Sequence, residues 1–456
     1  MLCYNCNKNL GIFQRGIMMY CLVSQLIVYR EFGPDSILMN LAKITEDYDA
    51  GAPKHELTTR IYAQVKRLLD LATEFGFDEN LWHNYLTFLL ITNENSFTLT
   101  AEKTGAQDGS VNHFVKNDYE IFRKLFAYDF SKLEQDLGID CFTTLQNYHA
   151  IIKKERMYNR NVSEKVRDLS KRLWESADVD AFFDILTGFY ADYGFGMFGL
   201  NPAFRLRDER LADGSVDIYP INNTEKVMLE DLVGYEWQKQ RLIENTEAFV
   251  AGKPANNCLL YGDSGTGKST CIKAIINRYY PDGLRMIEIY KHQFKDLNAV
   301  ISTIKNRNYR FIIYMDDLSF EEFETEYKFL KAVIEGGVEM KPDNILIYAT
   351  SNRRHLIKET WGDRENMEVH GEIHTNDSIQ EKLSLVNRFG ETINFSKPNR
   401  IEYHDIVREL AKRVPSITLD EKELLLKSDQ WEMSHGGISG RTAQQFINHL
   451  AGLSAK

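Results

Sequence analysis

The chain has 456 residues, of which 43% are hydrophobic and 27% are charged, and its net charge is -11. It is longer than one typical domain and has enough apolar residues for more than one hydrophobic core. The negative charge argues against a protein whose whole surface binds nucleic acid, although a local basic strip is compatible with it. Six cysteines in so long a chain do not suggest a disulfide scaffold, so we expect a cytoplasmic protein.

Residues 1–34 are predicted to form an N-terminal tail that contains one helix. Cys3 and Cys6 form a single C-x-x-C pair, which is half of a zinc knuckle, and no second pair of this kind follows. A metal is therefore disfavoured here. The apolar run at residues 16–29 is shorter than the roughly 20 residues that span a bilayer, and it is interrupted by Ser24 and Gln25. We expect a helix that packs on its own domain and no membrane segment.

Residues 35–200 are predicted to form a mainly helical N-terminal domain. Apolar residues recur at the helical spacing, for example at residues 60–71 and 81–90. The many aromatic residues here are best explained by core packing, and a role in base stacking is the weaker alternative. We expect this domain to recognise an unidentified macromolecule. Residues 201–228 contain Pro202, Gly214 and Pro220 and are predicted to be a linker that is able to pack as an extended segment.

Residues 229–398 are predicted to form an α/β nucleotide-binding core. Apolar strand candidates alternate with helical stretches, and they lie near Leu259, Met286, Ile312, Ile345 and Ile393. Such alternation predicts a five-stranded parallel sheet with right-handed crossovers. After Pro398 the pattern is helical again, so residues 399–456 are predicted to form a helical lid.

The most informative motif lies at residues 262–269, which match the phosphate-loop pattern G-x-x-x-x-G-K-[ST] between an apolar strand and a helix. Glycines let the backbone N–H groups and the helix N-terminus approach phosphates. Lys268 is expected to reach the β- and γ-phosphates, and Ser269 to bind Mg²⁺. The motif therefore predicts that the protein binds ATP and Mg²⁺. The predicted nucleotide-binding residues of this segment are Gly262, Asp263, Ser264, Gly265, Thr266, Gly267, Lys268, Ser269 and Thr270.

Two acidic residues follow the apolar strand at residues 311–315. Ligands of parallel sheets bind at the carboxyl ends of the strands, so Asp316 is predicted to bind Mg²⁺ and Asp317 to polarise the attacking water. Many proteins with this arrangement carry glutamate at the second position, and aspartate is one methylene shorter. We expect ATP hydrolysis and allow for a slow rate. The alternative is a pair of solvated acids at the end of a strand.

Three further polar residues follow predicted elements of the core and lid. Asn352 ends the strand at residues 344–351 and is expected to hold the nucleophilic water or to sense the γ-phosphate. Arg388 lies at the exposed end of a helix that stops at Gly390, where it can reach the phosphate site of a neighbouring subunit. Arg441 lies in the first turn of the last helix, behind Ser439 as its cap; a cation there opposes the helix dipole and indicates an anionic partner. The alternatives are a buried amide and surface charges.

Together these segments resemble the AAA+ ATPases, and more closely the bacterial family DUF815, whose function is unknown. The resemblance covers about half of the chain, from Leu229 to the C-terminus. It implies that Gly234 borders the adenine, that Asn352 is sensor 1, that Arg388 is the arginine finger and that Arg441 is sensor 2. The segments that carry it are residues 233–235, 262–269, 316–320, 350–356, 387–390 and 439–442.

The resulting prediction is a cytoplasmic Mg-ATP-dependent AAA+ ATPase that remodels or loads a partner macromolecule. Because Arg388 points away from its own phosphate loop, we expect it to act in trans within a ring-like homo-oligomer. One alternative is a nucleotide-gated binding or assembly module with slow turnover. Another is a DNA-linked ATPase similar to helicase loaders, which would require a basic groove. A small-molecule kinase would need an acceptor pocket and a base of its own, for which we find no motif.

Overall fold

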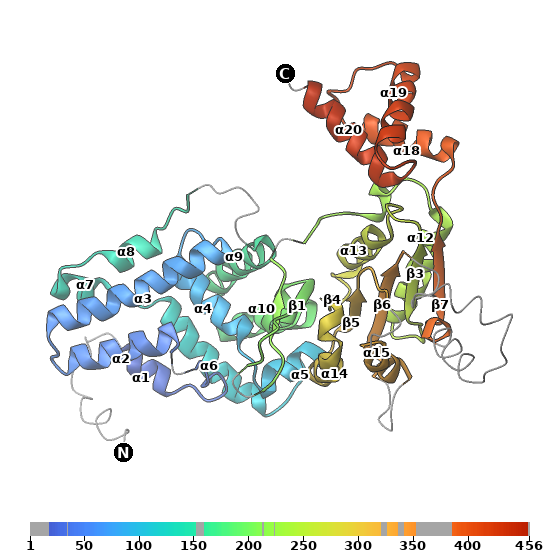
Figure 1. The fold of residues 1–456 in the computed structure, drawn as a ribbon. Coiled ribbons are helices and arrows are strands. Elements are labelled where there is room, and N and C mark those ends of the chain that lie inside the picture. The colour runs from blue at the N-terminus through green and yellow to red at the C-terminus, as the bar shows by residue number, and fades with distance from the viewer. Residues whose placement is uncertain are drawn as a thin grey trace. The chain divides into compact units, whose positions relative to one another are not determined.

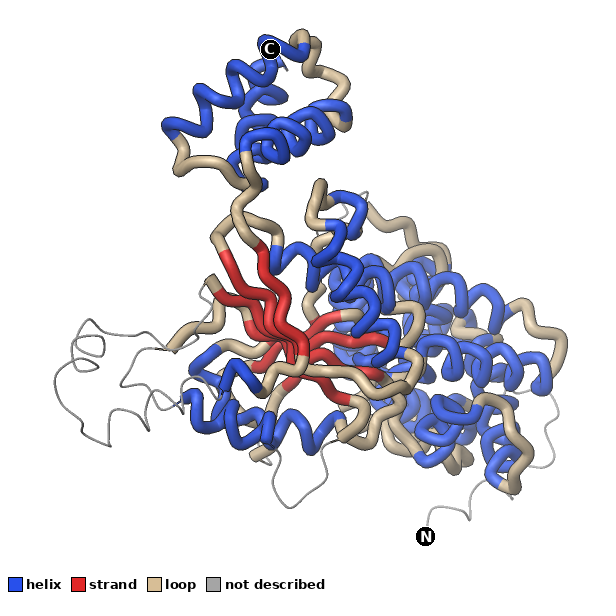
Figure 2. The backbone as a smooth tube through the Cα atoms, turned by 90° about the vertical axis from the view of Figure 1, so that its right-hand side faces the viewer, coloured by secondary structure: helices blue, strands red, loops and turns tan. Residues whose placement is uncertain are grey.

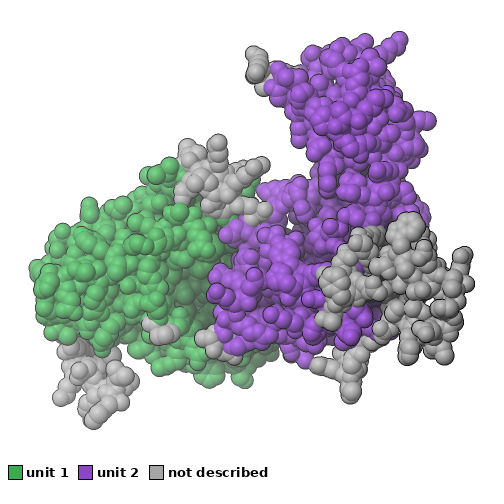
Figure 3. Space-filling view, viewed as in Figure 1, with its two compact units in different colours: residues 1–201 green, residues 202–456 purple. Residues whose placement is uncertain are grey.

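The computed structural model describes residues 18–33, 35–151, 159–211, 214–222, 224–320, 326–335, 342–352 and 385–454. Cys3 and Cys6 lie outside the described residues. The chain divides into two compact units, residues 1–201 and residues 202–456 (Figure 3). Within the described ranges, none of the helices combines the length and the apolar character that crossing a membrane requires.

Unit 1 is helical, as predicted for the N-terminal region (Figure 1). The predicted helical runs at residues 60–71 and 81–90 lie in α3 and α4. Side chains cap several helices; Asn80, for example, accepts the N–H of His83 at 2.9 Å at the start of α4. The helices are α1 Met19–Ser24, α2 Ile37–Asp49, α3 Lys54–Phe75, α4 Leu81–Thr92, α5 Ser96–Thr104, α6 Val111–Phe126, α7 Ser131–Leu137, α8 Cys141–Gln146, α9 Arg160–Trp174, α10 Val179–Tyr193 and α11 Gly196–Leu200.

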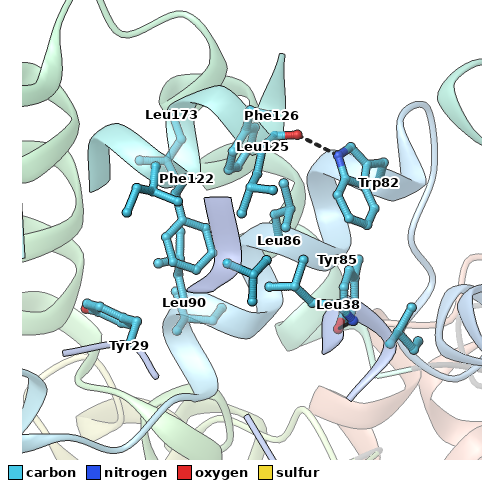
Figure 4. Close-up of a cluster of buried hydrophobic side chains, with 14 of the residues drawn as sticks. Tyr29, Leu38, Trp82, Tyr85, Leu86, Leu90, Phe122, Leu125, Phe126 and Leu173 are labelled. Carbon is cyan, nitrogen blue, oxygen red and sulfur yellow. Dashed lines mark hydrogen bonds between the residues drawn. The ribbon is translucent and has the colours of Figure 1, made fainter. Parts of the chain in front are cut away.

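Many aromatic residues of unit 1 pack in its core. Figure 4 shows the Nε1 of Trp82 donating to the carbonyl oxygen of Leu125, at 2.8 Å. The hydroxyl of Tyr29 bonds the hydroxyls of Tyr119 and Tyr190, each at 2.9 Å. These aromatic residues are buried, which agrees with core packing.

A buried carboxylate fixes the segment that follows α1. Asp118, on α6, has no exposed surface. Its Oδ2 accepts the N–H groups of Ile27, Val28 and Tyr29, at 3.1, 2.7 and 2.9 Å. One carboxylate thus satisfies three successive backbone donors, of which the N–H of Tyr29 is buried. The contact therefore holds residues 27–29 against α6.

Unit 2 contains a seven-stranded sheet with the order β2-β1-β4-β5-β6-β3-β7, seen edge-on as the red strands of Figure 2. Its pairs are parallel except that β2 is antiparallel to β1. The strands are β1 Ala203–Leu206, β2 Ile218–Pro220, β3 Cys258–Gly262, β4 Leu284–Glu288, β5 Arg310–Met315, β6 Ile345–Ser351 and β7 Glu391–Phe395. Strands β3 to β7 contain the five strands that we predicted.

Strands β1 and β2 correct our count of five strands, and they show that residues 201–228, which we predicted as a linker able to pack as an extended segment, contribute two strands to the sheet. Strand β1 pairs with β4, and its residues Ala203, Phe204 and Leu206 are buried. Pro202 directly precedes β1 and Pro220 ends β2 at the sheet edge, which are positions where a strand tolerates proline. We had interpreted both prolines as signs of a linker.

Helices and 3₁₀ helices complete unit 2. Helices α12 and α13 share a buried core with alternate residues of β3, β5, β6 and β7. The three C-terminal helices have a core of their own, which includes Tyr403, Val407, Phe446 and Ile447. The elements are the 3₁₀ helices η2 Leu229–Asp231 and η3 Lys291–Asp296, and the helices α12 Glu236–Val250, α13 Lys268–Tyr279, α14 Leu297–Ile304, α15 Glu326–Glu335, α18 Arg400–Lys412, α19 Glu421–Ser434 and α20 Gly440–Ser454.

Candidate nucleotide-binding site

The phosphate loop joins the end of β3 to the start of α13 and depends on its glycines. Gly262 and Gly267 have φ angles of 132° and 92°, which side-chain-bearing residues rarely adopt. A Cβ at Gly262 would collide with the carbonyl oxygen of Phe395, and one at Gly267 would collide with the side chain of Leu232. Both glycines of the motif are therefore required by close packing as well as by backbone conformation.

Lys268 is the buried cation of the loop, with 6% of its surface exposed. Its Nζ donates to the carbonyl oxygens of Gly262 and Asp263, at 3.0 and 2.6 Å, and to Oδ1 of Asn352, at 3.1 Å. Burial lowers the pKa of Lys268, and the nearby carboxylates of Asp317, Asp263 and Asp316 partly oppose this effect. Three acceptors, two of them carbonyl oxygens of the phosphate loop itself, thus fix the position of the ammonium group.

Ser269 and Asp316 form an oxygen-rich cluster beside the loop. Oδ1 of Asp316 accepts hydrogen bonds from the hydroxyls of Ser269, at 2.7 Å, and Thr350, at 2.6 Å. Burial raises the pKa of Asp316, but hydrogen bonds from Thr350 and Ser269 lower it more, so the net pKa lies below the ordinary value. The carboxylate is therefore charged at neutral pH.

The cluster fits Mg²⁺. A hydroxyl that donates its proton to a carboxylate keeps its lone pairs for a cation, and Mg²⁺ prefers oxygen ligands. Across the described parts of the chain, no group of three or more His, Cys, Asp or Glu side chains could hold a metal ion. A magnesium ion held by Ser269 and Asp316 would therefore share its shell with nucleotide phosphates and water, as it usually does in proteins.

Asp317 and Asn352 lie next to this cluster and contact each other. Nδ2 of Asn352 donates to Oδ1 of Asp317 at 2.7 Å, while Oδ1 of Asn352 accepts from Lys268. Asp317 has a φ of 50°, in the left-handed region that aspartate tolerates better than most residues. Its N–H donates to the hydroxyl of Thr350 at 2.9 Å.

Thr350 was missed as a site residue by our sequence analysis. Its hydroxyl bonds both the Asp316 carboxylate and the Asp317 backbone, so it fixes the end of β5 from β6. The signal was present, because Thr350 lies two residues before Asn352 and alternate residues of a strand share a face. This signal points to Asp316 and Asp317 only if β5 and β6 are known to be neighbours, which the sequence alone does not reveal.

These residues line one cavity of about 670 Å³, a size suited to a small-molecule ligand. From the predicted set it includes residues 264–270, Asp316, Asp317, Asn352 and Arg441. Apolar residues from the segment before α12 and from α18 also line it, among them Leu232, Val233, Ile406 and Leu410.

Gly262, Asp263 and Gly234 are not among the residues that line this cavity. Gly262 ends β3, and Asp263 Oδ2 accepts the N–H of Lys397 at 2.8 Å. Gly234, with φ 80°, lines a separate cavity of about 390 Å³, whereas its neighbours Val233 and Tyr235 line the larger one. The segment predicted to border adenine therefore reaches the site through the residues on either side of the glycine.

The C-terminal helical region contributes Arg441 and Arg413 to the cavity. The predicted cap is confirmed, since Oγ of Ser439 accepts the N–H of Thr442 at 3.1 Å, and the N–H of Arg441 donates to the carbonyl of Gly265 at 3.2 Å. Arg413, which the sequence analysis did not single out, donates to the carbonyl oxygens of Asp231 and Glu230, at 2.8 and 3.0 Å. It joins the C-terminal end of α18 to the 3₁₀ helix η2, which precedes α12.

Arg388 is not brought to this cavity. Strand β7 pairs Phe395 with Gly262 at the phosphate-loop end and Glu391 with Cys258 at the other end. Arg388 precedes Glu391, so it lies beyond the far end of a strand that spans about 13 Å. We expected an exposed arginine, but the side chain is only partly exposed and its Nη1 is buried. Arg388 does follow a helical stretch, at residues 385–387, but the core strand β7 begins only three residues later.

Comparison with known proteins gives a family. Residues 201–454 match the family described as "Protein of unknown function (DUF815)". Curated proteins yield no match. Among solved structures, a single-residue variant of Thermotoga maritima RuvB aligns with 48% of this chain and 63% of its own, at 15% identity and a TM-score of 0.34.

Two further structures align over a similar share of the chain. The FIGL-1 AAA domain in complex with ADP aligns with 50% of this chain and 74% of its own, at 17% identity and a TM-score of 0.34. The Thermotoga maritima RuvB Holliday junction branch migration motor aligns with 48% and 63%, at 13% identity and a TM-score of 0.32. This chain thus spans less than two thirds of the length of the RuvB chains. Because the family match covers more than half of its 456 residues, this chain belongs to the DUF815 family of proteins of unknown function.

Proposed function

We propose that the protein is a Mg-ATP-dependent ATPase of the AAA+ type that couples ATP binding and hydrolysis to the remodelling or loading of a partner macromolecule. The observation that carries this proposal is a single hydrogen-bonded network at the carboxyl ends of β3, β5 and β6. It contains Lys268, Asn352 and Asp317 on one side and Ser269, Asp316 and Thr350 on the other. Phosphoryl transfer needs the same components, namely a cation, a metal site and a group that orients water.

Each residue has a distinct task in this proposal. The backbone N–H groups of the loop and Lys268 bind the phosphates, and Ser269 and Asp316 hold Mg²⁺. When bound, Mg²⁺ neutralises phosphate charge. Asp317 and Asn352 orient the attacking water. We propose that Arg441 contacts the phosphates from the lid, since it lines the same cavity.

The contacts of Lys268 suggest how phosphate binding reaches Asn352. The three acceptors of its ammonium group are two backbone carbonyls and the Asn352 amide. A phosphate oxygen that takes up one of these hydrogen bonds displaces the Asn352 amide more readily than a carbonyl of the rigid loop. Asn352 would then turn towards the γ-phosphate, which is the behaviour of a nucleotide sensor.

The acidic pair provides the test. Asp316→Asn is expected to weaken ATP binding in the presence of Mg²⁺ but not in EDTA, because it removes the negative charge that would hold the metal and leaves the phosphate-binding residues in place. Asp317→Asn is expected to bind ATP normally and to lose turnover. Binding would be measured by calorimetry and turnover by phosphate release. Identical behaviour of the two variants would refute the division of roles, and wild-type protein that binds no ATP would refute the proposal.

A nucleotide-gated binding module with slow turnover is the second candidate. Asp317 favours it, because its short side chain is already bonded to Asn352 and its backbone is in the left-handed region. Typical enzymes turn over at about 1–1000 s⁻¹. A pure protein that binds ATP but turns over far more slowly, and whose assembly depends on ATP, would support this second candidate.

We further propose a cytoplasmic homo-oligomer in which Arg388 acts on a neighbour's phosphates. The register of β7 supports this, because it keeps Arg388 away from the loop of its own chain. The helical unit 1 is proposed to bind the macromolecular partner. A DNA-linked role would require binding that weakens steeply with salt, which titration of duplex and single-stranded DNA at two salt concentrations would reveal.

A further inference from the structure

Tyr314 is a buried tyrosine whose hydroxyl lacks a protein partner. It lies on β5 and is 1% exposed. No described residue forms a hydrogen bond with its hydroxyl oxygen. A buried polar group without a partner lowers stability, and in native structures it usually indicates a partner that the protein chain does not supply.

The hydroxyl lies at the proposed magnesium site. Tyr314 and Asp316 are alternate residues of one strand and its extension, so they share a face of the sheet. The ring packs in the core beneath α13 with Cys271 and Ile272. Ser269, Asp316 and Thr350 lie close to the hydroxyl, but none of them meets the distance and angle of a hydrogen bond with it. A tyrosine hydroxyl carries a proton that it can donate to another acceptor.

Tyr348 offers an internal comparison. It lies opposite Tyr314 on the neighbouring strand β6 and is also buried. Its hydroxyl bonds the Thr246 hydroxyl, at 2.9 Å, and the Asn245 amide, at 3.0 Å. The two tyrosines are in register, but only the hydroxyl of Tyr348 has a hydrogen-bond partner among the described residues. The hydroxyl of Tyr314 lies beside the oxygen-rich cluster of Ser269 and Asp316.

We propose that the Tyr314 hydroxyl is an outer-shell partner of the magnesium ion, donating a hydrogen bond to a water molecule that the ion carries. This inference rests on the proposed function, since it needs Ser269 and Asp316 to hold Mg²⁺. Magnesium usually keeps several waters when it binds a protein. Groups that hold such outer-shell contacts typically change metal affinity about 10- to 100-fold when they are removed. Tyr314 is thus a positioning residue.

The test is Tyr314→Phe, with Tyr348→Phe as the matched control and Asp316→Asn as the reference for a lost ligand. Mg²⁺ would be titrated into the full chain saturated with ADP, and the thermal midpoint would be measured in EDTA. We expect Tyr314→Phe to raise the Kd for Mg²⁺ about tenfold or more. The midpoint in EDTA should not fall, because the variant removes an unsatisfied hydroxyl. Tyr348→Phe should lower the midpoint and leave the Kd for Mg²⁺ unchanged.

The outcomes separate this inference from the proposed function. If Asp316→Asn weakens Mg²⁺ binding and Tyr314→Phe does not, Tyr314 is a core residue only and the inference fails while the ATPase proposal stands. If Tyr314→Phe lowers the thermal midpoint in EDTA as Tyr348→Phe does, its hydroxyl has a structural partner and the inference also fails. If wild-type nucleotide binding is indifferent to Mg²⁺, the metal assignment fails and the inference fails with it.

Discussion

Nδ2 of Asn352 donates a 2.7 Å hydrogen bond to Oδ1 of Asp317, so the loops that follow β6 and β5 are joined directly. This contact predicts that Asn352→Ala lowers the rate of hydrolysis without abolishing ATP binding. Loss of a group that assists proton transfer or orients water costs about 100-fold or more in rate. Asn394→Ala, an exposed amide on β7, serves as the control and should be nearly neutral. An unchanged kcat in Asn352→Ala would contradict the role of the amide.

Lys268→Ala is expected to weaken ATP binding by at least about 100-fold, because a charged hydrogen bond to phosphate is worth about 1.5–3 kcal/mol and the ammonium group has three donors to offer. The circular dichroism spectrum should not change. Lys427→Ala is the matched control, since Lys427 pairs only with Glu423 on the surface of α19 among the described residues. Calorimetric titration measures both variants. Equal ATP affinity in Lys268→Ala and wild type would mean that residues 262–269 are not a nucleotide-binding loop.

Mixing two inactive variants tests the assembly. Arg388→Ala and Lys268→Ala should each be inactive, since loss of an arginine finger costs about 10³ to 10⁵ in rate. In a mixed ring, an interface that joins the intact loop of the first variant to the intact arginine of the second should recover part of the ATPase activity. The recovery should rise with protein concentration. If the variants co-assemble and the mixture stays inactive, or if Arg388→Ala alone is fully active, Arg388 does not act in trans.

In unit 1, Asp118→Asn is expected to loosen the segment after α1. The amide offers the three N–H groups of residues 27–29 a weaker acceptor and adds an unwanted donor, at a cost of about 3 kcal/mol. Hydrogen–deuterium exchange of a peptide that covers residues 26–30 should accelerate strongly. The control is Asp180→Asn, which removes an exposed ion pair with Lys116 and should change exchange very little. Unaltered exchange in Asp118→Asn would show that other contacts hold the segment.

The phosphate loop could be predicted from sequence because its requirements are local. Gly262 and Gly267 are needed by the φ angles and packing of the loop itself, and Lys268 and Ser269 follow at fixed spacing. The family prediction, which rested on such short motifs, is confirmed by the match over residues 201–454. The α/β fold with a helical N-terminal region is also confirmed.

The features that were missed depend on contacts between distant residues. Thr350 acquires its role only because β6 pairs with β5, and Arg413 only because α18 meets the segment before α12. Strand β1 was missed for the same reason. Its four residues, which follow a proline, do not indicate a strand by themselves, and they form one because they pair with β4. Propensity is a weak guide where pairing decides the structure.

The position of β1 determines where the chain can be shortened to express unit 2 alone. A shortened chain that starts at residue 229, where the motifs begin, would lack β1 and β2 and leave the edge of β4 without its neighbour. Uncovered strand edges recruit other chains, so such a fragment should aggregate. A fragment from residue 202 keeps the sheet whole, and the family match begins at residue 201, immediately before this boundary. The segment that the family match covers therefore includes two strands, β1 and β2, that line no part of the candidate nucleotide site.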